Sequence, residues 1–327
     1  MKIGKIPENI LKRSVMKQLH YKRDEVLMGP SVGEDCTAVK LAEDEILVMS
    51  TDPITGTAND IGNLAIQITA NDLASSGAEP FGVMLTILLP DGTREIKLKN
   101  IMEQMEVACA AAHIQIMGGH TEVTSAVTRP VVNVVGVGKT KVGRMISTGG
   151  AKAGMDIVVT KWIGIEGTTI IAKEKEAELK QHFPSEYIDG AKELDKYLSV
   201  VPEAMIAVEN GVAAMHDITE GGIYGALWEM AEASGVGLEV DLKAIPVKQE
   251  TIEICEYYDV NPYGLISSGS MLMAAEDGEK LAAAIEAGGI KATVIGKFTD
   301  SNDRLIVRDE DRRFLESPKA DEIYKVC

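Results

Sequence analysis

The spacing of apolar residues alternates between strand-like runs and helical repeats in the first half of the chain. Helical spacing at 60–76 is followed by Gly77 and Pro80, which are typical helix stop signals. The expected elements are strands at 46–51, 81–89 and 130–137 and helices at 60–76 and 96–113. Asp52 is expected to end the first of these strands and begin a loop. A sheet combined with amphipathic helices predicts an α+β or α/β fold.

The Gly-rich stretch 149–154 is the best candidate for a boundary between two domains. At 327 residues the chain is long enough for two domains of ordinary size, which we expect at 1–148 and 149–327. The second is expected to contain strands at 155–164, 236–242 and 270–275, helices at 168–180, 190–199, 202–213 and 222–234, and a hairpin at 304–316.

Charge and cysteine usage narrow the classes of function. The chain has 33 Lys and Arg against 50 Asp and Glu, a net charge of −17, which argues against a nucleic-acid surface. It does not argue against nucleotides, since carboxylates can meet phosphates through Mg²⁺. No apolar run is long enough for a membrane span, and the first residues lack a signal-peptide core. The four cysteines are scattered without a CxxC pair, which indicates a reducing cytoplasm and no zinc knuckle.

Acidic residues near expected strand ends and helix starts are candidate metal ligands. If Asp35, Asp52 and Asp72 converge, their carboxylates would supply hard oxygen ligands for a Mg²⁺ ion that also binds phosphate. Asp52 is otherwise a turn former, and Asp60 is most simply a helix N-cap. Asn71 and Asp72 interrupt an apolar helix in which both have poor propensity, which favours a binding role.

Gly118–Gly119–His120–Thr121 is a candidate anion site, because paired glycines let backbone N–H groups approach a phosphate. The glycines could instead simply close a helix, and His120 could be a structural histidine. The chain has neither a P-loop motif nor a GxGxxG dinucleotide motif.

His216–Gly222 (HDITEGG) is the densest polar cluster of the second half, and it precedes an apolar helix. A helix N-terminus flanked by glycines can receive phosphate, although an elaborate N-cap has the same appearance. Ser267–Ser268–Gly269 is a weaker candidate loop, since such residues commonly form turns.

The ordered set of motifs resembles the aminoimidazole-ribonucleotide (AIR) synthetase, or PurM-like, superfamily. The segments that carry the resemblance are GEDCTAV at 33–39, STDP at 50–53, the helix and turn at 60–80, GGHTEV at 118–123 and HDITEGG at 216–222. The resemblance implies an N-terminal domain that pairs its sheet across a homodimer, a C-terminal α+β domain, and ATP with Mg²⁺ in a cleft near the dimer interface.

The resemblance also implies roles for individual residues. The implied metal ligands are Asp35, Asp52 and Asp72, and the implied nucleotide contacts are Asn71, Gly118, Gly119, Thr121, Asp217, Gly221 and Gly222. The candidate catalytic groups are His120, Glu122 and Cys327.

Within the superfamily the chain is most similar to the HypE-like branch of hydrogenase maturation proteins. That branch dehydrates a carbamoyl group on its C-terminal cysteine to a thiocyanate, and this chain ends in Cys327. The branch carries Lys at the position where this chain has Glu122. It also carries Glu near the position where this chain has Ser268. The resemblance therefore implies a carbamoyl-transferring maturation partner. A kinase resembling thiamine-monophosphate kinase and a non-catalytic nucleotide-binding protein are the alternatives.

The C-terminal segment allows two arrangements. Residues 316–325 are polar enough to move and to deliver Cys327 into an ATP cleft, or they pack on the body of the protein. The α-carboxylate beside the Cys327 thiol is expected to raise its pKa, because like charge disfavours the thiolate.

Overall fold

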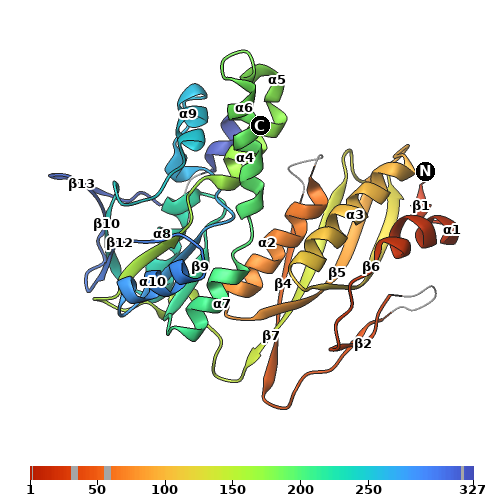
Figure 1. Ribbon diagram of the computed structural model, residues 1–327, viewed down its shortest axis with the longest axis horizontal. Coiled ribbons are helices and arrows are strands. Elements are labelled where there is room, and N and C mark those ends of the chain that lie inside the picture. The colour runs from red at the N-terminus through yellow and green to blue at the C-terminus, as the bar shows by residue number, and fades with distance from the viewer. Residues whose placement is uncertain (2, 31–35, 55–59, 318–319) are drawn as a thin grey trace. The chain divides into compact units, whose positions relative to one another are not determined.

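The computed structural model describes the whole chain apart from residues 2, 31–35, 55–59 and 318–319. The chain forms two compact units (Figure 1). Unit 1 contains Met1–Ala74 and Ala78–Met145, and unit 2 contains Ser75–Gly77 and Ile146–Cys327.

Unit 1 is built on a five-stranded mixed sheet with the order β1-β6-β5-β7-β4. Its strands are β1 (Gly4–Lys5), β2 (Val26–Met28), β3 (Ala38–Val39), β4 (Glu45–Ile54), β5 (Glu79–Pro90), β6 (Gln115–Thr124) and β7 (Val131–Lys141), of which β2 and β3 form a separate hairpin. Its helical segments are α1 (Glu8–Ile10), α2 (Ile61–Ser75), α3 (Glu95–Ala111) and the short turns η1 (Leu11–Val15) and η2 (Met16–Gln18).

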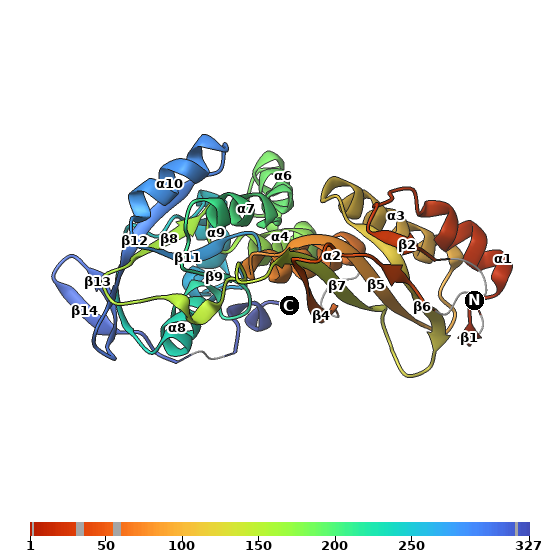
Figure 2. The same ribbon diagram turned by 90° about the horizontal axis from the view of Figure 1, so that it is seen from below.

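The helices α2 and α3 cover one face of this sheet (Figures 1 and 2). The approach of α2 to β7 is close because Gly136 has no side chain: a methyl group there would lie 2.4 Å from Thr69 and 3.0 Å from Leu73. The opposite face carries exposed apolar side chains on β4, where Leu47 is 42% and Met49 is 58% exposed. One face of the sheet is therefore a core surface. The other, called the open face below, is exposed along β4 but is covered around Val137 by Val26 and Val39 of the β2–β3 pair.

Two expectations for unit 1 were wrong in detail. β4 does not end at Asp52 but continues through Pro53 to Ile54, paired with β7. Proline is tolerated there because β4 is the last strand on its side of the sheet, where an N–H donor is not needed. Gly118 and Gly119 do not close a helix either, since they lie inside β6.

Unit 2 is built on a seven-stranded sheet with the order β14-β13-β10-β12-β8-β11-β9. Its strands are β8 (Asp156–Thr160), β9 (Ala214–Asp217), β10 (Gly237–Asp241), β11 (Met271–Ala275), β12 (Ala292–Thr299), β13 (Arg304–Arg308) and β14 (Asp311–Phe314). Its helices are α4 (Ile165–Glu174), α5 (Glu176–Leu179), α6 (Ser185–Lys192), α7 (Val201–Glu209), α8 (Gly222–Ser234), α9 (Gln249–Tyr257) and α10 (Gly278–Ala287). Short turns are η3 (Thr148–Gly150), η4 (Glu193–Tyr197), η5 (Pro262–Gly264) and η6 (Glu322–Lys325).

The core of unit 2 lies largely between this sheet and α8. The fully buried side chains Ile223, Leu227 and Met230 of α8 pack with Leu272 and Phe298 of the strands. The expected helix at 222–234 and the expected hairpin near the end of the chain are both confirmed. Within the described residues, no helix combines the length and the apolar character that a membrane crossing requires.

Candidate functional site

Two of the predicted metal ligands lie close together on the helix-covered face of unit 1. The Ser50 hydroxyl on β4 donates a hydrogen bond of 2.5 Å to Oδ2 of Asp72 on α2. Asp52 follows Ser50 by two residues on the same strand, so it faces the same side about 7 Å further along. Asn71, next to Asp72 in α2, is completely buried. β4 and α2 thus present two carboxylates and an amide in one region.

Of the two glycines of β6, Gly119 is required by a close backbone contact. Gly119 has φ +148°, and a methyl group on it would lie 2.1 Å from the Leu85 carbonyl oxygen on β5. A methyl group on Gly118 would meet only the Met84 side chain, at 3.6 Å. Gly119 therefore serves the pairing of β6 with β5, whereas Gly118 has room for a small side chain.

His120 and Glu122 form a pair on the opposite face of the same sheet. The Nε2 atom of His120 lies 3.1 Å from Oε2 of Glu122, and both side chains are partly exposed. The strand register places His120 in one row with Thr86, Asn133 and Pro53. Residues opposite one another in a ladder share a face, so this row is on the open face, and Asp52 is on the other.

Within one chain, the acidic pair Asp52 and Asp72 lies apart from the glycines of β6. Asp52 and Gly119 share a row, but Val134 and Leu85 lie between them. Three steps between neighbouring strands amount to about 14 Å. Val134 is completely buried and Leu85 is 4% exposed, so that interval is filled by core. The two sets of residues predicted to contact phosphate do not converge inside unit 1.

A cavity of about 480 Å³ lies at the β6 edge of the unit 1 sheet. Residues 118–121 contribute its polar wall, and Leu11, Val15 and Met16 of the N-terminal segment contribute apolar surface. Cys36 also lines it. Its volume is in the range of small-molecule pockets, and its apolar lining with few polar groups is typical of them.

Asp35, the third predicted metal ligand, lies outside the described residues. Among the residues that are described, no three His, Cys, Asp or Glu side chains come together as a metal site. The donors present at Asp52 and Asp72 are carboxylate oxygens, which is the chemistry that Mg²⁺ accepts.

In unit 2 the predicted residues gather at the start of α8. Asp217 ends β9 and is 5% exposed, while Gly221 and Gly222 both have left-handed backbones, with φ of 82° and 61°. A methyl group on Gly222 would lie 2.6 Å from the Tyr263 carbonyl oxygen, so only glycine fits. This packing sets the N-terminus of α8 against η5.

A buried carboxylate beside this region was missed from the sequence. Glu166, in the first turn of α4, is 3% exposed, and its Oε2 accepts a hydrogen bond of 3.3 Å from the Ser268 N–H. Its pKa is raised to about 7, chiefly by burial; the hydrogen bonds from Ser268 oppose this shift, and the charges of Asp321 and Asp217 add to it. A glutamate in a first helical turn usually stabilises the helix from the surface, so nothing in the sequence distinguishes this one.

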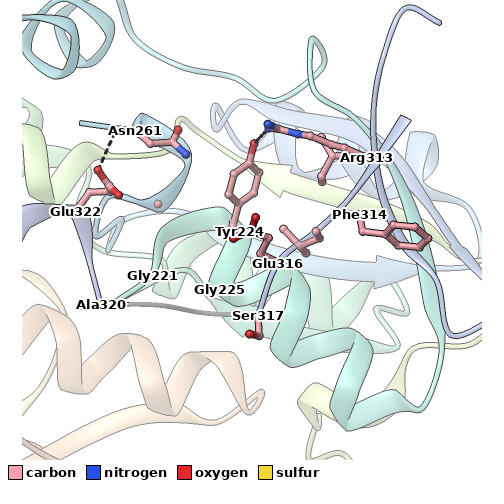
Figure 3. A pocket seen from close by; sticks show the side chains of 13 residues that line it. Gly221, Tyr224, Gly225, Asn261, Arg313, Phe314, Glu316, Ser317, Ala320 and Glu322 are labelled. Carbon is pink, nitrogen blue, oxygen red and sulfur yellow. Dashed lines mark hydrogen bonds between the residues drawn. The ribbon is translucent and has the colours of Figure 1, made fainter. Parts of the chain in front are cut away.

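A second missed carboxylate belongs to the C-terminal segment. Asp321 is 2% exposed and accepts backbone hydrogen bonds from Gly221 at 2.6 Å, Ile266 at 3.1 Å and Ile323 at 2.8 Å. Burial raises its pKa, and the three N–H donors oppose that shift. Figure 3 shows the neighbouring segment, with Ser317, Ala320 and Glu322 along a pocket of about 300 Å³ next to Gly221.

The C-terminal segment is packed on unit 2, which is the second of the two arrangements weighed above. Ile323 is 8% exposed within an apolar cluster that Val326 also contacts, and Cys327 at the end is exposed. The expected rise of the Cys327 pKa is confirmed, but the leading cause is partial burial, with a further contribution from Glu174 and opposition from Lys175.

Two models of the AIR synthase related protein family match the chain, the N-terminal domain over residues 33–140 and the C-terminal domain over 152–308. Carbamoyl dehydratase HypE of Cupriavidus necator is 30% identical over 285 residues, which cover 84% of this chain and 79% of that protein. The chain belongs to the AIR synthase related family, in its HypE-like branch.

Two further comparisons concern the sequence and the fold. A putative hydrogenase expression/formation protein of Methanocaldococcus jannaschii is 27% identical over 333 residues, covering 99% of this chain and 97% of that protein. A crystal structure of the hydrogenase maturation protein HypE in complex with ATP matches with a TM-score of 0.81 at 20% identity, covering 99% of this chain and 97% of that one. The expected two-domain α+β fold is confirmed.

Proposed function

We propose that this HypE-like protein is an ATP-dependent carbamoyl dehydratase that acts in hydrogenase maturation on a carbamoyl group carried by Cys327. The observation that carries the proposal is an exposed C-terminal cysteine at the end of a packed segment. It occurs in a chain that is 30% identical to a protein named carbamoyl dehydratase. A free thiol in this position fits the reducing cytoplasm expected from the sequence.

The proposed reaction converts a thiocarbamate into a thiocyanate. The carbamoyl oxygen attacks the γ-phosphorus of ATP, ADP leaves, and the nitrogen loses one proton, giving an imidate phosphate on the Cys327 sulfur. Loss of the second N–H proton and of phosphate then forms the C≡N bond. Both steps release a proton, and the His120–Glu122 pair, held 3.1 Å apart, is our candidate acceptor.

Each unit, taken by itself, contains candidate groups for binding the nucleotide. Asp52 and Asp72 would hold Mg²⁺, which neutralises phosphate charge when bound. Asn71, Gly118, Gly119 and Thr121, with Asp217, Gly221 and Gly222, are our candidates for contacts to ATP. The cavity beside Gly118–Thr121 supports this assignment, because it offers apolar surface next to accessible backbone.

A homodimer could form through the open face of the unit 1 sheet, opposite the face that carries Asp52 and Asp72. The acidic pair and the glycines are about 14 Å apart in one chain, with core between them, so one phosphate cannot contact both. The exposed Leu47 and Met49 give the open face of the sheet an apolar surface for a second copy. We therefore propose a homodimer in which this apolar surface forms the contact between the two copies.

The thiol of Cys327 needs a carbamoyl donor, so we propose a carbamoyl-transferring maturation partner that loads it. The deciding experiment incubates the full chain with ATP, Mg²⁺ and such a carbamoyl donor system and analyses the C-terminal peptide by mass spectrometry. Cleavage at acidic residues is required, because trypsin would cut after Lys325 and leave only a dipeptide. A thiocyanate on Cys327, absent in Cys327→Ala, is the expected result.

The same experiment separates the alternatives. Release of ADP only with an added small molecule, undiminished in Cys327→Ala, would assign a small-molecule kinase and refute the carrier role. Tight ATP binding without any hydrolysis in the loaded protein would assign a nucleotide-binding partner protein instead.

A further inference from the structure

The C-terminal segment is attached to unit 2 by a buried anion. Asp321 brings its carboxylate to three backbone N–H groups, two of which belong to other parts of the chain, Gly221 before α8 and Ile266 after η5. At 2% exposure it has little contact with water, so these donors replace its hydration. A buried carboxylate without them would be strongly unfavourable, which makes the contact specific.

The position of this carboxylate coincides with one end of the candidate nucleotide site. Gly221 donates to Oδ2 of Asp321 at 2.6 Å, which is a short charge-assisted hydrogen bond. Gly221 is also one of the residues that we assign to phosphate. A single N–H can satisfy one strong acceptor, so a phosphate oxygen at Gly221 requires the carboxylate to leave.

We propose that Asp321 is a positioning residue for Cys327: its carboxylate fixes the C-terminal segment by occupying the Gly221 N–H, so that docking of this segment and phosphate binding at Gly221 exclude each other. The exclusion rests on the proposed function, whereas the anchoring role does not. Cys327 follows Asp321 by six residues and is connected to it through η6, whose Ile323 carbonyl accepts the Cys327 N–H at 3.0 Å.

The apolar contacts of the segment are too few to fix it alone. Ile323 is the buried apolar side chain of η6, while Tyr324 is 64% exposed. The neighbouring Glu322 accepts one backbone hydrogen bond, from Asn261 at 3.0 Å (Figure 3). Glu322 is also paired with Lys325. Asp321 therefore supplies two of the hydrogen bonds that attach the last residues to other parts of unit 2.

Hydrogen exchange of the full chain tests the anchoring role without ATP. In Asp321→Asn one carboxylate oxygen is replaced by an N–H₂ group that faces donors, so the C-terminal peptide should exchange at least about tenfold faster. Peptides from β11 and α10 should be unchanged. Asp300→Asn, an exposed carboxylate of the same unit, is the matched control and should leave the C-terminal peptide as in wild type. Unchanged exchange in Asp321→Asn would overturn the anchoring role.

The exclusion is tested with Mg²⁺–ATP as the probe. In the wild type, saturating ATP should accelerate exchange of the C-terminal peptide. Asp321→Asn, and a chain ending at Ala320 as a second variant, should bind ATP several-fold more tightly, because the competing carboxylate is gone. A purely structural role would leave the affinity unchanged or lower it.

The two possible failures are distinguishable. If ATP binds to wild type while exchange of the C-terminal peptide stays constant and the variants bind no more tightly, the exclusion is wrong. If ATP binds to none of the proteins, the proposed function fails and the exclusion with it. The exchange comparison without ATP still decides whether Asp321 anchors the segment.

Discussion

Replacing Glu166 by Gln should stabilise the protein, and more so as the pH rises. Glu166 is 3% exposed beside Asp217 and Asp321, and its pKa is raised from 4.5 to about 7. Between these values the folded protein holds a proton that the unfolded chain has released. The native state therefore binds more protons, and stability falls as the pH rises through this window.

The size of the effect follows from the shift. A shift from 4.5 to about 7 corresponds to about 3 kcal/mol of lost stability at pH 8, and to about 1 kcal/mol at pH 5. Glutamine has nearly the same shape, its amide does not ionise, and its oxygen can still accept the Ser268 N–H. Relative to wild type, Glu166→Gln should therefore gain about 2 kcal/mol more at pH 8 than at pH 5.

Urea unfolding at a series of pH values measures this difference, with a probe in unit 2 such as the fluorescence of Trp162 and Trp228. Glu286→Gln, at an exposed position of α10, is the control and should show no such pH dependence. An equal stability difference between Glu166→Gln and wild type at pH 5 and pH 8 would refute the reasoning.

Four other substitutions probe unit 1 and one probes unit 2. Gly119→Ala should destabilise by about 3 kcal/mol because its methyl group would overlap a backbone oxygen 2.1 Å away, whereas Gly118→Ala should cost little; thermal unfolding compares them. Lys161→Met removes the ammonium group that lies 2.7 Å from the carboxylate of Glu203 on α7, whose side chain is 1% exposed. The free energy of unfolding in denaturant should fall by about 3–5 kcal/mol, unlike for the same change at an exposed lysine. Asp52→Asn should weaken Mg²⁺–ATP binding at least about tenfold in calorimetry, and equal affinity would refute its role as a ligand. Met49→Glu should give a monomer by light scattering if the open face pairs two copies, and an undiminished dimer would contradict that surface.

The parts of the fold that could be predicted are those in which local signals agree. The helix at 222–234 was predicted with its observed bounds, because left-handed glycines at 221 and 235 bracket an apolar repeat. The hairpin at the end of the chain was recognisable for the same reason, since polar turn residues separate its two strands. Neither element needs a distant contact to be recognised.

The errors arise where distant contacts decide the structure. Gly118 and Gly119 have low strand propensity, and β6 forms around them because Gly119 lets the backbone approach Leu85. Pro53 reads as a strand terminator unless the edge position of β4 is known. Similarly, Glu166 and Asp321 gain their chemical character from burial by segments about 100 residues away, such as Ser268 and Gly221.

The sheet of unit 1 acts as a partition between two kinds of chemistry. Acid groups such as Asp52 are on the side that the helices shield, and His120 is on the side that faces outward. Side chains on one face of the sheet contact different residues from those on the other face. A substitution on one face therefore leaves the contacts on the other face unchanged. Under the roles proposed above, such a protein could exchange the groups that act on its substrate and keep those that bind the nucleotide, by replacing only alternate residues of a single strand.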